Sequence, residues 1–469
     1  MESYMLKNYL LPFTIVTLIF TSCKNEHPSN DYVAYFGGEI SNPTSPYVIF
    51  CKDSEPIDTI QLNKDNTFSK KFDSLTPGLY SFKHEPEYQY VYFEKNDSLM
   101  VTINTKDFDQ SIVFSGRGDD KNNFLMDLYL KNEADREKMF AVLDFGFNKF
   151  SANIDSSYQS KVSYYQKKKE IIKWSDDFDL YAKASLDFYH FSKKEVYPMV
   201  HKMRTGEDVR AKLPKNYFQF REAIDFNNNK FTNFSPFVKY LTNMLNNITM
   251  EKTGVAENEM DTSLKLNIEK LNVADTLFQN KKIKNTILNN IAFSYLLEDQ
   301  NITNIQKFLN RFNEISTDKS KHNEISKIGS AIQSLKVGDA LPNINLIDID
   351  NKTNDVKSIL KKKSVIFFWT DCLDSHMIAA HKKVIELEKK HKNYQFIAIN
   401  VDQSQEKWIS DVRNSKFQNV KEYRCVNFEE LKEKWVINKI HRTIITNENG
   451  TIDNAFVSLF DINFEKLLK

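Results

Sequence analysis

The spacing of apolar and polar residues changes twice along the chain. From Tyr32 to about Gly118, short runs rich in Val, Ile, Tyr and Phe, such as YVIFCKD and YQYVYFE, are separated by Pro, Gly, Asn and Asp. Runs of this kind between turn residues predict short strands. We therefore expect an antiparallel β domain over residues 31–118, packed as a small sandwich or barrel.

From Asp119 to about Lys336 the apolar residues recur at the spacing of an α-helix. Three stripes show it: Phe178, Tyr181, Ala182, Leu186 and Tyr189; Ile283, Ile287, Leu288, Ile291 and Tyr295; and Ile302, Ile305, Leu309 and Phe312. The last two stripes flank a polar break at 299–301, which predicts a helical hairpin. Pro198, Gly206 and Pro214 indicate a loop in the middle of this helical domain.

From Val337 onward the pattern alternates between strand and helix. Ser364–Trp369 and Tyr394–Asp402 are continuous apolar runs typical of buried parallel strands. A helix from about Asp374 would carry four apolar residues on one side: Met377, Ala380, Val384 and Leu387. The expected fold class is therefore α+β and multidomain, with an antiparallel β domain, a helical domain and a C-terminal α/β domain over 337–469.

The amino-acid composition indicates a folded protein and argues against one class of binding partner. The 469 residues are 41% hydrophobic, which is enough apolar material for folded cores, and 64 Lys and Arg balance 63 Asp and Glu. Because no net charge attracts a polyanion, we expect no nucleic-acid partner.

The N-terminal residues have the features of an export signal. Lys7 precedes the apolar run Tyr9–Phe20, and small residues then lead to Cys23. This run of twelve residues, which contains Pro12, is shorter than the ~20 residues of a membrane-spanning helix and suits a secretory signal. A buried terminal strand is the alternative, but the run lacks polar alternation. We expect residues 1–22 to be a signal peptide.

The sequence FTSC, which ends at Cys23, resembles the bacterial lipobox. The resemblance implies that Cys23 becomes the lipid-modified first residue of the mature protein and that the membrane is a partner through this anchor. Residues 23–30 then form a polar tether. The expected location is the cell envelope, periplasmic or at the outer membrane. Simple cleavage that gives a soluble periplasmic protein is the alternative.

Several ordered segments after Lys336 resemble membrane-anchored thioredoxins of the TlpA kind. They are VGDALPNINLID with Gly338 and Pro342, SVIFFW, YQFIAINVD, and ELKEKWVINKIHRTIITNENGTI with a turn at Asn447–Gly450. The resemblance implies a thioredoxin-like fold for 337–469. The β domain, through FGGEI, the IDTI…F hairpin and FSGRGDDKNNF, resembles a small domain of unknown function that precedes thioredoxin domains in lipoproteins of Gram-negative bacteria. The helical domain between them covers 119–336.

Thioredoxin chemistry needs two cysteines. The first, at a helix N-terminus, attacks as a thiolate, and the second resolves the mixed disulfide. Aligned without a gap on the family's FWAxWCxxC, the segment FFWTDCLDSH puts Leu373 and His376 at the cysteine positions. With one residue deleted, Cys372 and Ser375 take these positions. Either alignment lacks at least one thiol, so we do not expect dithiol reductase activity.

A second departure concerns the substrate groove of the family. Counted back from the turn at Asn447, His441 takes the place of the family's cis-proline. Because a non-proline cis bond costs ~3 kcal/mol, we expect a trans peptide and an altered groove.

The remaining cysteines are Cys51, Cys372 and Cys425. Cys51 lies in a predicted strand and is interpreted as a small buried hydrophobic residue. Cys372, with Ser375 and His376 nearby, is the one candidate for catalysis, as a monothiol. We favour a thiol without catalytic role, either left over or paired with Cys425, because a monothiol needs an external resolving thiol.

The histidines do not form a metal motif. His376, His381 and His391 share a probable helix, but their offsets of five and ten miss the i, i+4 spacing that points two ligands the same way. We expect neither a metal nor a cofactor.

Two functions follow from these observations. The first is a non-catalytic binding or scaffold role in the envelope, with an unknown protein, peptide or small-molecule ligand. The alternative is an envelope protein related to thiol-disulfide oxidoreductases that acts as a monothiol through Cys372.

Overall fold

The computed structural model describes residues 33–53, 55–298, 301–371, 373–402, 404–415, 420–437, 440–461 and 463–468. The described residues form two compact units, one up to Lys52 together with Pro56–Asn122, and the other made of the rest of the chain. Among the helices described, none is both long and apolar enough to cross a membrane. The signal peptide and Cys23 lie outside these ranges.

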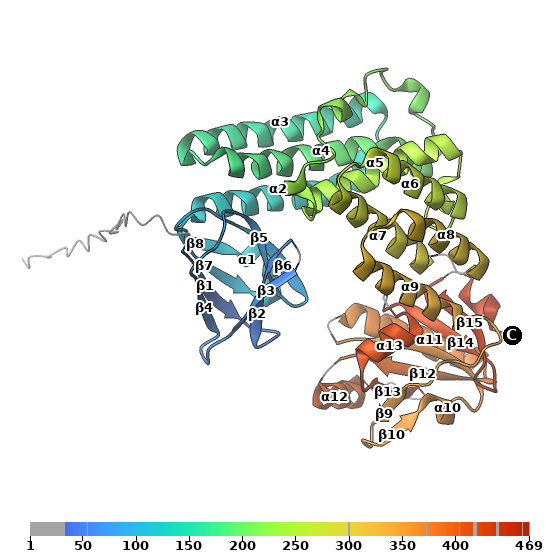
Figure 1. The fold of residues 1–469 in the computed structure, drawn as a ribbon. Helices are drawn as coiled ribbons and strands as arrows, with labels where there is room; N and C mark the ends of the chain where they lie inside the picture. Colours follow the sequence, from blue (N-terminus) through green and yellow to red (C-terminus); the bar gives the residue numbers. More distant parts are fainter. Residues whose placement is uncertain are drawn as a thin grey trace, which may run out of the picture. The chain divides into compact units, whose positions relative to one another are not determined.

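The first unit is a sandwich of two four-stranded sheets (Figure 1). Its strands are β1 (Ala34–Ser41), β2 (Tyr47–Lys52), β3 (Glu55–Gln61), β4 (Thr67–Phe72), β5 (Gly78–His84), β6 (Glu87–Phe93), β7 (Ser98–Asn104) and β8 (Val113–Arg117), with η1 (Thr105–Asp107) and α1 (Phe108–Ser111) before β8. The sheet orders are β4-β1-β7-β8 and β3-β2-β5-β6. The predicted β domain is confirmed.

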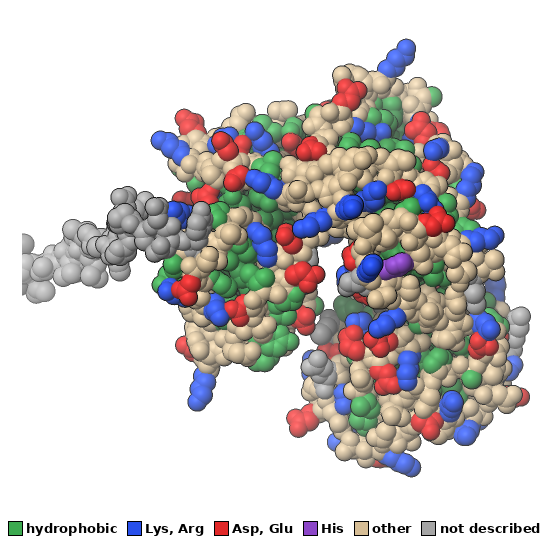
Figure 2. Space-filling model, viewed as in Figure 1, with side chains coloured by type: hydrophobic (Ala, Val, Ile, Leu, Met, Phe, Trp, Pro, Cys, Tyr) green, Lys and Arg blue, Asp and Glu red, His purple; other side chains and the backbone are tan. Residues whose placement is uncertain are grey.

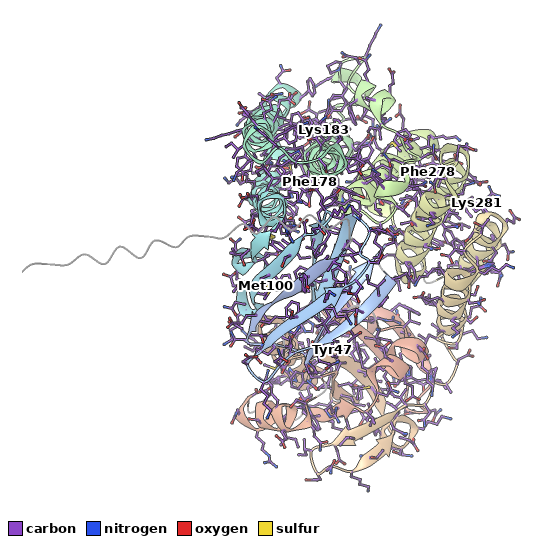
Figure 3. The ribbon with its side chains drawn as sticks, turned by 60° about the vertical axis from the view of Figure 1, so that its left-hand side comes forward. Tyr47, Met100, Phe178, Lys183, Phe278 and Lys281 are labelled. Atoms are coloured by element: carbon purple, nitrogen blue, oxygen red, sulfur yellow. The ribbon has the colours of Figure 1, made fainter. Side chains whose placement is uncertain are left out.

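Alternating side chains build the core of this sandwich. On β1, Phe36 is buried and Tyr35 is exposed, and on β7, Leu99 is buried while Met100, labelled in Figure 3, is exposed. Aromatic rings fill the interior, with Phe36 and Phe50 at 5.3 Å between ring centroids. β1 and β7 pair in parallel, unlike the antiparallel pairs β1–β4 and β7–β8. Turn patterns predict only hairpins between consecutive strands, so they do not reveal this long-range pair.

Helices and short 3₁₀ turns occupy the chain from Asp119 to Gln333. They are α2 (Asp119–Leu143), α3 (Phe147–Ile172), α4 (Asp176–Thr205), η2 (Arg210–Lys212), η3 (Gln219–Ala223), η4 (Asn229–Phe231), α5 (Ser235–Thr253), η5 (Glu257–Glu259), α6 (Leu264–Leu277), α7 (Lys281–Glu298), α8 (Ile302–Ile315) and α9 (Lys319–Gln333). Phe178 and Lys183 of α4, both labelled in Figure 3, are buried and exposed respectively. The helical interpretation is confirmed, and α7 contacts α8 as the predicted hairpin requires.

The loop predicted at Pro198 is wrong, because Pro198 is buried inside α4, which continues to Thr205. A proline cannot donate to the carbonyl four residues before it, here that of Lys194. The hydroxyl of Tyr217 donates to this carbonyl at 3.1 Å and so replaces the missing hydrogen bond. Gly206 ends the helix in the left-handed region, at φ 79°.

We predict that Tyr217→Phe lowers the free energy of unfolding by about 1–2 kcal/mol, because it leaves the Lys194 carbonyl without a donor. In a Pro198→Ala background the restored backbone N–H can reach that carbonyl, so the same substitution should cost less. Urea unfolding of the four members of this double-mutant cycle measures the difference. An equal loss in both backgrounds would contradict the account.

The C-terminal part is an α/β domain with one seven-stranded sheet, in the order β10-β9-β13-β12-β11-β14-β15 (Figure 1). Its elements are β9 (Asn345–Asp348), β10 (Thr353–Asp355), α10 (Val356–Ile359), β11 (Lys363–Trp369), α11 (Asp374–Lys390), β12 (Tyr394–Asn400), α12 (Gln405–Ser415), β13 (Lys421–Cys425), α13 (Phe428–Trp435), β14 (Arg442–Thr446), β15 (Ile452–Ser458) and η6 (Phe464–Leu467). β11 pairs in parallel with β12 and antiparallel with β14. The strand–helix alternation predicted from Val337 is confirmed.

Helices cover both faces of this sheet. The four residues of the predicted α11 stripe pack with Val365, Phe367 and Trp369 of β11 in one core cluster, which also contains Trp408 of α12. Phe368 points to the opposite face and contacts Trp435 of α13, at 6.2 Å between ring centroids. β11 is therefore buried on both sides, as its continuous apolar sequence predicted.

Candidate functional site

The candidate site lies where β11 ends and α11 begins. Thr370, Asp371 and Leu373 are described in the connecting loop, whereas Cys372 lies outside the described residues. The antiparallel register pairs Phe367 with Thr443, so the residues just before β14 approach the end of β11. The topology therefore brings the positions predicted from sequence, in the first turn of α11 and at His441, to the same end of the sheet.

Asp402 fixes the loop after β11. Its Oδ1 accepts a hydrogen bond of 2.5 Å from the Thr370 hydroxyl, and its Oδ2 accepts one of 2.7 Å from the backbone N–H of Asp371. The Asn400 side chain also donates to Oδ2, at 2.7 Å. The Asp371 carboxylate in turn forms an ion pair with Lys407. Two successive residues of the loop are thus anchored to the end of β12.

A buried carboxylate lies beneath this loop. Glu422 of β13 is bound at both oxygens, by His381 Nε2 at 2.9 Å and by the indole N–H of Trp369 at 3.2 Å. The His381 side chain is 0% exposed and the Glu422 side chain 4%. The network joins α11, β13 and the last residue of β11.

The His381 ring has an assigned orientation in this network. Its Nδ1 lies 2.7 Å from the carbonyl oxygen of Met377, which can only accept, so Nδ1 carries a proton. One further proton lies in the hydrogen bond between Nε2 and Oε1 of Glu422. If Nε2 carries this proton, the two side chains form an ion pair; if Oε1 carries it, both side chains are neutral. In both forms each group of the pair is satisfied.

We predict that Glu422→Leu lowers the free energy of unfolding of this domain by about 3 kcal/mol, because it leaves the buried imidazole without its partner. Replacing both His381 and Glu422 by Leu should recover part of this loss, since an apolar pair needs no compensation. Urea unfolding followed by tryptophan fluorescence compares the two variants. A double variant less stable than Glu422→Leu would argue against the network.

His376 lies in the first turn of α11, half-buried beside Phe460, with ring centroids 5.6 Å apart. Its Nδ1 is buried and has no hydrogen-bond partner among the residues that the structure describes. Burial lowers the pKa of His376 below its usual value, and the nearby imidazoles of His441 and His381 lower it further. Ser375 beside it is exposed.

His441 is exposed, and the peptide bond before it is trans, since the cis bond among the described residues joins Glu85 to Pro86. The next residue, Arg442, is buried. Its Nε donates a hydrogen bond of 2.8 Å to the carbonyl oxygen of Ala455, and one of its terminal nitrogens donates a hydrogen bond to the carbonyl oxygen of Val436. Val436 has φ 54°, a left-handed conformation that costs a β-branched residue ~1–2 kcal/mol. The hydrogen bond from Arg442 thus stabilises the strained backbone at Val436.

The other cysteines do not supply a second reactive thiol. Cys425 is buried at the end of β13 as a free thiol, and burial raises its pKa to about 11. A thiol of this kind is almost entirely protonated at neutral pH and reacts poorly. Cys51 is buried within β2, as the sequence predicted.

Sequence reasoning missed Asp402, Glu422 and the pairing role of His381. Asp402 ends the apolar run of β12, and Glu422 is a single acidic residue in a short strand, so neither stands out in sequence. In the part of the chain that the structure describes, no three His, Cys, Asp or Glu residues are placed to hold a metal ion.

Residues 361–452 match the model of a family described as thioredoxin-like. Solved structures similar to this chain include the thioredoxin domain of a thiol-disulfide oxidoreductase from Bacteroides vulgatus, at 17% identity, 29% coverage of this chain and 100% of that chain, with a TM-score of 0.25. A thioredoxin-like protein from Bacteroides caccae matches at 16% identity, 55% and 93% coverage, with a TM-score of 0.35. Comparison with curated proteins gave no significant match.

The family match and the strand order together define the class of the C-terminal part. It is a thioredoxin-like α/β domain. The domain is attached to a β sandwich and a set of helices within the same chain.

Proposed function

We propose that this chain is an envelope lipoprotein whose thioredoxin-like domain binds an extended polypeptide segment without dithiol chemistry. The observation that carries the proposal is the set of residues at the site. Ser375 and His376 occupy the first turn of α11, and His441 precedes β14. None of these three side chains can form a disulfide, so a two-electron exchange between neighbouring sulfurs has no second sulfur.

The surroundings of the site suit binding. Leu373 is 46% exposed at the start of α11, and Phe460, which contacts His376, is 45% exposed. We call Leu373, His376, His441 and Phe460 the site surface. Exposed apolar side chains that lie beside a few polar groups are typical of interaction sites. Asp402 anchors Thr370 and Asp371 in the same loop as Leu373, and such anchoring reduces the entropy that a loop loses on binding.

The proposed ligand class also agrees with the charge distribution. On the face drawn in Figure 2, Lys and Arg side chains are interspersed with Asp and Glu. Such a surface provides no field of one sign for a polyanion. An uncharged, partly apolar peptide segment is the ligand that the site surface favours.

A monothiol role for Cys372 is the second candidate. The sequence places Cys372 between the anchored Asp371 and the beginning of α11, where the helix dipole favours a thiolate. Turnover would require an external thiol to resolve the mixed disulfide.

We predict that short peptides selected from a displayed random library bind the full chain and that Leu373→Glu weakens them at least tenfold, since the carboxylate places a charge on an apolar contact. Ile171→Glu is the matched control, because Ile171 on α3 is also an exposed apolar residue, at 65% exposure. Fluorescence anisotropy gives both affinities. Equal weakening by the two substitutions, or none by Leu373→Glu, would reject the site surface as the binding site.

We further predict that cells expressing the chain incorporate labelled fatty acid into it at Cys23. Cys23→Ser should abolish the label and release the protein from the membrane fraction, because the acyl chains supply the anchor. Cys51→Ser serves as the control that keeps the label. Membrane association of the Cys23→Ser variant at the wild-type level would contradict the lipid anchor.

A further inference from the structure

We propose that one face of the β sandwich docks on the membrane surface and so orients this unit at the bilayer. The face belongs to the sheet β4-β1-β7-β8 and points away from the interior of the sandwich; we call it the outer face. The inference rests on the lipid anchor at Cys23, which is part of the proposed function. The outer face itself is built by the first unit alone.

Three exposed apolar side chains cross the outer face on neighbouring strands. Tyr35 of β1 is 42% exposed, Met100 of β7 is 43% exposed and Val113 of β8 is 56% exposed. The register pairs Tyr35 with Ser98, two residues before Met100. It pairs Val113 with Thr102, two residues after Met100. Because diagonal neighbours on one face of a sheet are within reach of long side chains, the three residues form a diagonal apolar stripe.

Gly37 makes room for the Met100 side chain at the centre of this stripe. The two residues are paired across β1 and β7, and a Cβ atom on Gly37 would come within 3.0 Å of the Met100 sulfur. The thioether therefore lies over the backbone of β1. Methionine is flexible and adapts to what it contacts, so the stripe suits a partner without a fixed shape, such as the headgroup and acyl boundary of a bilayer.

Charged side chains flank the stripe on the outer face. Lys71 of β4 and Arg117 of β8 lie in the same row of the sheet as Tyr35, and Glu39 lies nearer the other end of β1. Lys71 also forms an exposed ion pair of 2.7 Å with Asp73, which contributes little. The long stems of Lys and Arg allow their charged ends to stay among headgroups when the stripe makes contact. Tyrosine favours the same boundary, since its ring is apolar and its hydroxyl polar.

The position of the anchor favours a membrane as the partner of this face. Residues 24–33 connect Cys23 with β1, which begins at Ala34. This connection can span at most ~40 Å, against ~27 Å for the eight residues of β1 itself. An acylated Cys23 thus keeps the sandwich close to the bilayer, and partners linked in this way meet at an effective concentration on the order of millimolar. Even a weak apolar contact is then formed for a large fraction of the time.

Quenching by brominated acyl chains tests the contact, with the full chain in vesicles of phosphatidylethanolamine and phosphatidylglycerol. Met100→Trp adds one tryptophan to the four of the native chain, all of which are buried. We expect bromination to lower the emission of this variant by about one fifth relative to the native chain, because one of its five tryptophans then lies at the acyl boundary. Tyr35→Trp, a conservative aromatic exchange, is a second probe of the outer face and should be quenched to the same extent.

Tyr88→Trp is the matched control, because Tyr88 is 48% exposed on β6 of the other sheet and should not be quenched. Equal quenching of the control, or none of either probe, overturns the docking face. Self-association in detergent that Met100→Glu abolishes, without quenching in vesicles, overturns it in favour of a second copy of the chain.

Mass spectrometry of the same sample separates this inference from the proposed function. Acyl chains on Cys23 without quenching of the probes overturn the docking face and leave the anchor intact. Absence of acyl chains from protein isolated with the membrane fraction overturns the anchor, and the docking face with it.

Discussion

Glu422 sets the geometry of the site because it is a carboxylate buried in a sheet with both oxygens committed to other elements. His381 of α11 binds one oxygen and Trp369 at the end of β11 binds the other. A buried polar group that loses its hydrogen-bond partner costs free energy whether it is charged or neutral, so these three residues stay together. The start of α11 is held against β11 and β13 as a result, and Asp402 fixes the loop between them.

The contacts that hold the thioredoxin-like domain together are of two kinds. The core of the thioredoxin-like domain consists of apolar residues on β11, α11 and β12 and of the polar network at Glu422. None of these contacts involves a cysteine pair. The packing of this core therefore does not depend on a disulfide.

Local patterns predicted much of this structure. The α11 stripe from Met377 to Leu387 and the continuous apolar strand β11 were readable because each depends on a periodicity of neighbouring residues. The β1–β7 pair and the contact between His381 and Glu422 join residues far apart in sequence, and no periodicity encodes them.

Pro198 shows a related limit of local reasoning. A proline predicts a loop, but the hydroxyl of Tyr217 binds the carbonyl that the proline leaves free, and α4 continues. A tertiary contact thus overrides a strong local signal. The absence of a CxxC motif, in contrast, is read directly from the sequence, which is why the expected chemistry could be argued before the fold.

The most direct test of the account is the reduction of a model protein disulfide by the full chain in the presence of dithiothreitol, with a Cys372→Ser variant measured in parallel. The account predicts that both proteins give the rate of dithiothreitol alone. Dithiothreitol would resolve any mixed disulfide formed at Cys372, so an unchanged rate means that Cys372 does not react with the substrate. A wild-type rate that clearly exceeds the rate of Cys372→Ser would contradict it.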